Sequence, residues 1–254
     1  MPHTSITIFT LQPGQRRWGL AQMGTSPPVL RRVPGLKFFK LLGSGAANGF
    51  GLWPNLDRYG FMAVWEDEAA ADAFFAGHPL WATYQARSAE QWALGLAPVK
   101  SQGLWDGQTP FAYAPPTPVT APAGSDNDDS APMAVLTRAS ISWRKTRRFW
   151  QFVEPTSAAL AQAAGVRAAI GLGELPVVRQ ATFSVWESAR AMQQYAYRDA
   201  RHREVIILTK REQWYREELF ARFRVLSSAG TLDGRNPLAD LNAHPEFPIR
   251  SSER

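Results

Sequence analysis

The chain contains no cysteine, and this absence excludes several kinds of chemistry. It rules out disulfides, cysteine-ligated zinc, iron–sulfur clusters and a thiolate-ligated haem. The sequence also lacks an apolar run of about 18 residues, the length needed to cross a bilayer, and its N-terminus lacks the basic-then-apolar order of a signal peptide. We therefore expect a cytoplasmic protein, with the membrane surface as the alternative location.

Several catalytic and ligand-binding motifs are missing as well. There is no G-x-S-x-G nucleophile motif, and the glycine-rich segment Gly43–Gly51 fits neither G-x-G-x-x-G nor a P-loop. No second His, Asp or Glu stands at ligand spacing around His202, which argues against a three-ligand zinc site. The formal net charge of +6 is not accompanied by a nucleic-acid-binding motif. We predict no nucleic-acid partner.

The sequence does contain an internal repeat covering about half of the chain. Three pairs of segments recur in the same order, with offsets of 121, 127 and 130 residues. The pairs are YGFMAVWEDEAAADAF (59–74) with QATFSVWESARAMQQY (180–195), SQGLWDGQTPF (101–111) with SAGTLDGRNPL (228–238), and GLKFFKLLGSG (35–45) with GVRAAIGLGEL (165–175). A repeat of this length indicates two similar domains rather than a solenoid.

Each half has the order strand, helix, strand, strand, helix, strand. In the first half the strands are Ser5–Thr10, Leu36–Leu42, Arg58–Trp65 and Trp92–Val99, and the helices are Arg16–Met23, interrupted by Pro27 and Pro28, and a broken helical region from Glu66 to about Gln91. In the second half the strands are Met133–Trp143, Val166–Leu172, Ala181–Trp186 and Leu219–Leu226, and the helical regions are Lys145–Ala164 and Glu187 to about Trp214. The predicted fold class is α+β, with duplicated ferredoxin-like βαββαβ units that form a pseudo-twofold dimeric α/β-barrel.

The predicted domain boundaries follow from this repeat. Residues 1–113 form the first ferredoxin-like repeat, 114–132 a Pro/Asp-rich linker, 133–238 the second repeat and 239–254 an irregular tail.

Four histidines are present, of which two lie in the predicted repeats. His3 and His244 lie in termini that we expect to be mobile, whereas His78 and His202 lie in similar places in the two halves. His202 is flanked by arginines and is followed by the apolar run 205–208. This setting suits an iron ligand beside the carboxylates of a macrocycle. The alternative is a surface histidine in an arginine-rich helix.

Longer segments of the sequence resemble a known family. They are KLLGSGAANGFGLWPNLDRYGFMAVW (40–65), TRASISWRKTRRFWQFVEP (137–155), IGLGELPVVRQATFSVW (170–186), WYREELFARFRVL (214–226) and GTLDGRNPL (230–238). Together they resemble spheroidene monooxygenase, a bacterial ketolase of acyclic carotenoids. The resemblance runs from about residue 6 to residue 238.

The resemblance implies a haem-dependent monooxygenase that acts on a long apolar polyene with O2 and reduced ferredoxin. It implies haem b in the second repeat, with a histidine of that half on the iron, and the matching residue is His202. Arg198, Arg201 and Arg203 are the candidates for binding the haem propionates, and helix phase decides which of them points inward. His78 remains a competing ligand. The alternative functions are a haem enzyme of another reaction type, similar to aldoxime dehydratase, and a non-catalytic haem-binding protein.

One basic cluster is a candidate surface for the electron donor. Arg144, Lys145, Arg147 and Arg148 lie near the predicted start of a helix, where the helix dipole disfavours positive charge. We predict that these residues attract an acidic donor such as ferredoxin. A solvated face is the alternative.

Overall fold

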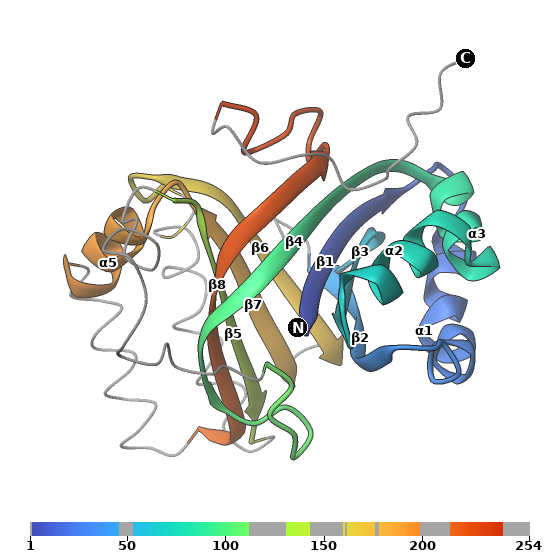
Figure 1. The fold of residues 1–254 in the computed structure, drawn as a ribbon, viewed down its shortest axis with the longest axis horizontal. Helices are drawn as coiled ribbons and strands as arrows, with labels where there is room; N and C mark the ends of the chain where they lie inside the picture. The colour runs from blue at the N-terminus through green and yellow to red at the C-terminus, as the bar shows by residue number, and fades with distance from the viewer. Residues whose placement is uncertain are drawn as a thin grey trace. The chain divides into compact units, whose positions relative to one another are not determined.

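The computed structural model describes residues 2–45, 53–111, 131–142, 160, 162–175, 178–198 and 214–240 (Figure 1). The fold is α+β, with antiparallel strands and helices packed against them. The chain divides into two compact units. Unit 1 comprises Met1–Ser44, Pro54–Ala97 and Val225–Arg254, and unit 2 comprises Gly45–Trp53 and Pro98–Arg224.

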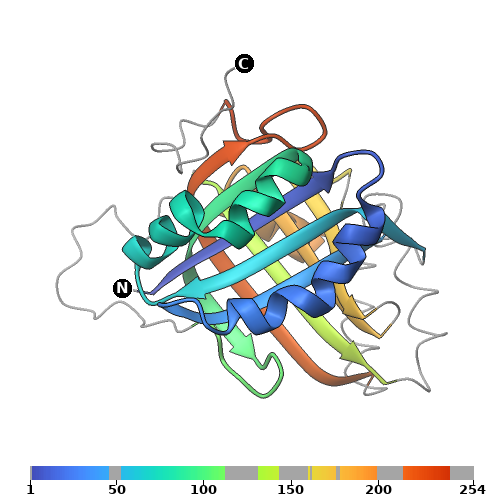
Figure 2. The same cartoon turned by 90° about the vertical axis from the view of Figure 1, so that its right-hand side faces the viewer.

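Within the described residues, unit 1 is a sheet with three helices on one face. Its elements are β1 (His3–Leu11), α1 (Arg16–Leu30), β2 (Leu36–Gly45), β3 (Pro54–Trp65), α2 (Glu68–Gly77), α3 (Pro79–Arg87) and the first part of β4 (Ser88–Gly103). The strand order is β4-β1-β3-β2, with β1 antiparallel to both β3 and β4. Figure 2 shows α1, α2 and α3 on the near side of this sheet.

Local sequence accounts for the ends of the two short helices. The Asp67 side chain accepts a hydrogen bond from the Ala70 backbone N–H and so caps α2. α3 begins at Pro79, whose missing N–H costs nothing at a first helical position. Nδ1 of His78 accepts the Leu80 N–H at 3.2 Å, so this histidine is the N-cap of α3.

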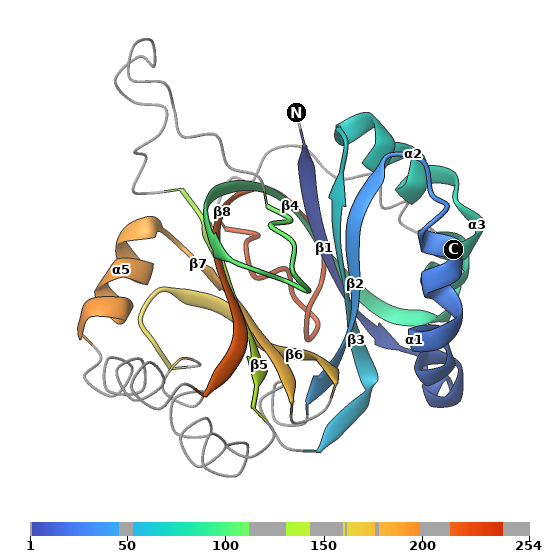
Figure 3. The same cartoon turned by 90° about the horizontal axis from the view of Figure 1, so that it is seen from below.

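Unit 2 repeats the strand order of unit 1. Its described elements are the end of β4, β5 (Met133–Ile141), β6 (Val166–Leu175), β7 (Arg179–Trp186), α5 (Ala189–Arg198) and most of β8 (Tyr215–Gly230). The order is β8-β5-β7-β6, so in both units the first strand lies between the third and the fourth. Figure 3 shows α5 beside the β6–β7 part of the sheet.

Two glycines make the correspondence between the units specific. Gly35 and Gly165 precede the second strand of each unit, with φ of +75° and +79°. A Cβ on either glycine would lie 2.5 Å from an alanine Cβ, of Ala70 in α2 and of Ala191 in α5. Both positions therefore require glycine, for backbone conformation and for close approach of the helix. This pair aligns the second strands of the two units at an offset of 130 residues.

The structure corrects two local predictions. α1 does not stop before Pro27 and Pro28 but continues to Leu30. The helix continues because the missing proline N–H groups remove only two of its hydrogen bonds, whereas its last turn is anchored by the buried residues Ser26 and Leu30. His3 is not in a mobile terminus: it is 6% exposed and pairs with Trp65 as the first residue of β1.

Candidate functional site

The predicted iron ligand lies in a part of the chain that the structure does not describe. Arg201, His202 and Arg203 fall between residues 198 and 214, outside the described ranges. Arg198 is the last residue of α5, and only its backbone is described. The ligand and its arginine partners therefore stay predictions. Within the described residues no group of three or more His, Asp or Glu could hold a metal ion.

In unit 1 the space between sheet and helices is filled by aromatic side chains. Phe9, Tyr59 and Phe61 on β1 and β3 are all at most 5% exposed and pack with Phe39 and Leu41 of β2. The helices add further rings, those of Phe74, Phe75, Trp81 and Tyr84. A cavity of about 10 Å³ remains, which is no more than a single water molecule needs. Between these described side chains of unit 1, the layer thus leaves no space for a large ligand.

The matching face of unit 2 can be identified from packing and register. Val135, Val166 and Ala169 pack with Trp186 and the α5 residue Met192, so these residues lie on the face that α5 covers. Cross-strand partners share a face. The register then adds further residues to this face, among them Thr137, Ala139, Gly171, Gln180, Thr182 and Ser184.

Five large side chains of unit 1 are replaced by smaller ones on this face. In unit 1 the partners are His3↔Trp65, Thr7↔Phe61 and Phe9↔Tyr59, and in unit 2 they are Met133↔Trp186, Thr137↔Thr182 and Ala139↔Gln180. Together with the glycine alignment, this gives the correspondences Phe9 to Ala139, Tyr59 to Gln180, Phe61 to Thr182, Phe39 to Ala169 and Leu41 to Gly171. Thr137, in the middle of the central strand, is exposed, whereas its counterpart Thr7 is fully buried. We call this surface the small-residue face.

A cation and an aromatic ring border the small-residue face on β8. Arg222 pairs with Val135 and Phe220 with Thr137, so both side chains are on the α5 side. The corresponding pairs of unit 1 place Gly95 and Ala93 at these positions. The Arg222 guanidinium lies 5.3 Å from the centre of the Phe220 ring, a cation–π contact.

The Nε atom of Arg222 is out of contact with water and has no hydrogen-bond partner among the described residues. A buried donor without a partner costs about 1–3 kcal/mol, and more when it is charged. Its position beside the small-residue face suits a ligand that is flat, mostly apolar and negatively charged at one edge. The negatively charged edge of such a ligand would accept the Arg222 hydrogen bond.

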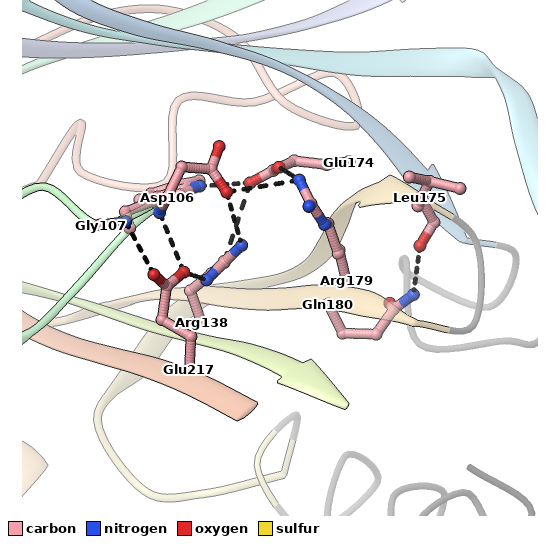
Figure 4. Close-up of polar contacts among 9 residues, drawn as sticks. Asp106, Gly107, Arg138, Glu174, Leu175, Arg179, Gln180 and Glu217 are labelled. Atoms are coloured by element: carbon pink, nitrogen blue, oxygen red, sulfur yellow. Dashed lines mark hydrogen bonds and ion pairs between the residues drawn. The ribbon is translucent and has the colours of Figure 1, made fainter. Parts of the chain in front are cut away.

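A second group of charged side chains, on the opposite face of the unit 2 sheet, has a structural explanation (Figure 4). Arg138 on β5 is 2% exposed and forms an ion pair with Glu217. Its Nη2 atom also lies 3.4 Å from Oδ1 of Asp106, and its Nε atom lies 3.7 Å from Oε1 of Glu174. Nη1 of Arg179 contacts the same two carboxylates, at 3.3 Å from Oδ1 of Asp106 and 3.1 Å from Oε2 of Glu174. We call these five residues the Arg138 cluster.

The Arg138 cluster holds the tight turn that follows β4. Glu217 accepts the backbone N–H groups of Asp106 and Gly107 at 2.9 and 2.8 Å. Burial alone would raise the pKa of Glu217, but these two N–H groups and the Arg138 guanidinium lower it below its ordinary value. Unit 1 holds its own turn in the same way, because Glu90 accepts the N–H groups of Asp233 and Gly234. This duplication indicates a fold-stabilising role.

Comparison with curated proteins shows the family. The chain is 35% identical over 240 residues to a spheroidene monooxygenase of Rhodobacter capsulatus, covering 94% of this chain and 96% of that protein. It is 39% identical over 232 residues to the spheroidene monooxygenase of Rubrivivax gelatinosus, covering 91% and 84%. The chain belongs to the spheroidene monooxygenase family. No family model matches the sequence.

Among solved structures, this spheroidene monooxygenase family member is similar in fold to aldoxime dehydratase. One crystal structure matches with a TM-score of 0.56 at 11% identity, covering 88% of this chain and 81% of that one. A complex of an aldoxime dehydratase with butyraldoxime matches with the same TM-score at 9% identity. At these identities the similarity concerns the fold alone.

Residues of the small-residue face were not predicted from the sequence of this family member. A usable signal existed in the segment 221–224, where apolar residues and arginines alternate. Leu219, Ala221 and Phe223 are fully buried, so the residues between them, Phe220 and Arg222, must point to the other face. The size difference between the repeats was also visible once the strands were aligned, but that alignment requires the register.

Proposed function

We propose that the chain is a haem-dependent monooxygenase that oxidises a long apolar carotenoid with O2, and that reduced ferredoxin is the electron donor. The relatives named spheroidene monooxygenase support the monooxygenase reaction and the carotenoid substrate. The arrangement of the two repeats as a pseudo-twofold barrel is part of the same proposal.

The observation that carries the cofactor is the difference between the two sheet–helix layers. In unit 1 the layer is filled with rings, and in unit 2 the matching sheet positions carry Ala139, Ala169, Gly171, Gln180 and Thr182. Haem is flat, mostly apolar and carries two carboxylates at one edge. A sheet face with small side chains suits such a ring, because no large side chain separates the backbone from the ligand at these positions.

The charged residues also fit haem. Arg222 has a buried Nε without a partner among the described residues, and a carboxylate would satisfy it with a charge-assisted hydrogen bond. Arg198, Arg201 and Arg203 are further candidates for the second carboxylate. We propose His202 as the iron ligand, through a neutral imidazole nitrogen.

Bound haem b would supply the activation of O2, a reaction that side chains alone do not perform. The chain's own residues have three tasks in this proposal. The apolar side chains Val135, Val166 and Phe220 would exclude water from the reacting carbon. The arginines would fix the cofactor's orientation, and the surrounding apolar surface would hold the end of the polyene.

The proposal is tested by turnover with isotopically labelled oxygen. Purified protein, reconstituted with haem b, is supplied with reduced ferredoxin, an acyclic carotenoid in detergent and ¹⁸O2. We expect a carotenoid product that contains ¹⁸O and is absent when haem is omitted. Conversion of an aldoxime to a nitrile without carotenoid oxidation would instead establish dehydratase chemistry, and a haem protein inert towards both substrates would refute the enzyme assignment.

A further inference from the structure

α1 of unit 1 has an outward face that is unusual for a helix in water. Its inner side is buried at Gly19, Ser26 and Leu30, and a Cβ on Gly19 would lie 2.5 Å from a methyl carbon of Leu11. The helix is therefore packed tightly against the sheet through a defined face. The opposite face is on the outside of the unit (Figure 2).

The outward face carries no charged side chain over nearly the whole length of α1. The thirteen residues from Trp18 to Leu30 include no Asp, Glu, Lys or Arg. Leu20 and Val29 are 58% and 42% exposed, and the exposed surface between them is formed by small or uncharged residues, Ala21, Gly24, Thr25 and Pro28. A helix that faces water normally places charged residues on that side.

Arginines stand at both ends of this uncharged stretch. Arg17, Arg31 and Arg32 are exposed, and no hydrogen bond or ion pair of their side chains occurs among the described residues. Arg16 is the exception because it forms an ion pair with Asp57 at 2.6 Å. α1 itself contains no acidic residue. We call the exposed side of residues 17–32 the α1 outer face.

This distribution of charge favours a lipid surface over a protein. An acidic protein partner would be met best by cations across the centre of the contact, and the centre of the α1 outer face is uncharged and partly apolar. A helix that lies in a membrane interface inserts its apolar side chains among the lipid chains, and its flanking arginines contact anionic headgroups. Within the described residues no helix is long and apolar enough to cross a bilayer.

We propose that the α1 outer face docks the protein on an anionic phospholipid bilayer. Leu20 and Val29 border this face on its two sides, nine residues or about 180° apart around the helix. They therefore contact the lipid at the two edges of the docked face, and Arg17, Arg31 and Arg32 contact lipid phosphates. The lipid contact follows from α1 alone. Its purpose rests on the function proposed above: a carotenoid is too apolar to dissolve in water, so the enzyme must collect it from the hydrocarbon of the bilayer.

The test is co-sedimentation of the full-length protein with vesicles of phosphatidylcholine alone and with an equal part of phosphatidylglycerol. We expect binding to the anionic vesicles only, weakened by salt. Because each arginine near an anionic surface contributes about 1 kcal/mol, equivalent to roughly fivefold in affinity, the double variant Arg31→Gln/Arg32→Gln should bind about thirtyfold more weakly. Leu20→Gln should weaken binding without changing its dependence on salt.

The matched control is Leu226→Gln/Arg235→Gln, which removes an exposed leucine and an exposed arginine outside α1. It should bind vesicles as the wild type does. Equal loss of binding in the control and in the α1 variants would overturn the proposal. So would α1 variants that bind vesicles normally but accept electrons from ferredoxin more slowly, because the surface would then dock a protein.

Activity in detergent separates this proposal from the proposed function. With carotenoid supplied in detergent, the α1 variants should turn over at the wild-type rate, and with carotenoid supplied in vesicles they should be slower. Wild-type protein that binds anionic vesicles but oxidises no carotenoid would refute the proposed function and support the docking surface.

Discussion

Thr182→Phe should block cofactor binding while leaving the fold intact. Thr182 lies between Thr137 and Gly171 in the register of the unit 2 sheet, and it corresponds to Phe61 of unit 1. Phe61 is 3% exposed, and its ring centre lies 5.8 Å from that of Phe74 and 6.0 Å from that of Trp81. A phenylalanine at 182 would restore this bulk on the small-residue face.

The expected losses of unfolding free energy differ sharply between Thr182→Phe and its counterpart in unit 1, Phe61→Thr. Thr182 is half-buried beside the exposed Thr137, so its substitution should change the unfolding free energy of the haem-free protein by less than about 1 kcal/mol. Phe61→Thr removes a fully packed ring and should cost about 3–5 kcal/mol. The haem bound per folded molecule should fall strongly in Thr182→Phe and stay at the wild-type level in Phe61→Thr.

Two assays separate these effects. Urea denaturation of the haem-free proteins gives the unfolding free energies, and the pyridine haemochrome gives the haem bound per folded molecule. If Thr182→Phe keeps its full haem content, or if it destabilises the protein as much as Phe61→Thr does, the small-residue face is an ordinary packed core and the reasoning is wrong.

Three further predictions concern charged and titratable groups. Arg222→Met should not destabilise the haem-free protein, because it removes a buried donor without a described partner. It should lower haem affinity about tenfold or more. A titration with haem measures this affinity, and an unchanged value would exclude Arg222 from the site. The pKa of Glu217 is lowered, so its contribution to stability is present above the ordinary value of 4.5 and is lost as the pH falls through the folded-state pKa. Glu217→Gln should therefore flatten the acid limb of stability against pH, and an acid limb of wild-type steepness would show that Glu217 is not linked to it. Burial lowers the pKa of His3 below its ordinary value of 6.5, despite the opposing charges of Glu68 and Asp72. The unfolded chain therefore binds the proton more readily than the folded one, so the free energy of unfolding falls as the pH drops below about 6.5. His3→Gln should remove this slope, which urea denaturation between neutral and mildly acidic pH can measure, and persistence of the slope would exclude His3 as its source.

Much of the strand pattern could be predicted from local sequence. Alternation of apolar residues and the turn glycines located the eight strands that the described residues form, although the structure extends several of them, such as β4 to Gly103 and β8 to Gly230. The ends of these strands are held by hydrogen bonds between strands and by the contacts of Glu90 and Glu217 with the turns, not by apolar packing. Their sequence therefore shows little alternation of apolar residues. The α+β class is confirmed. The domain boundaries at 113 and 133 and the barrel arrangement stay predictions.

The candidate site was harder to predict because its features depend on pairs of strands. A threonine at position 182 is unremarkable in the sequence, and it becomes informative only when the register places it where unit 1 has Phe61. The same holds for Arg222, whose importance lies in a buried atom without a described partner. The prolines of α1 show the same limit of local rules, because packing of Ser26 and Leu30 decides where this helix ends.

The haem content of His202→Ala, compared with that of His78→Ala, decides which unit holds the cofactor. In the structure His78 caps α3 through Nδ1, and its ring lies 4.9 Å from that of Phe74, in a unit whose sheet–helix layer is already filled. His78→Ala should cost about 1 kcal/mol of stability through loss of the cap and should retain haem with an unchanged Soret band. His202→Ala should lose both. Full haem and an unchanged Soret band in His202→Ala, with loss of both in His78→Ala, would place the cofactor in the other unit and contradict the account.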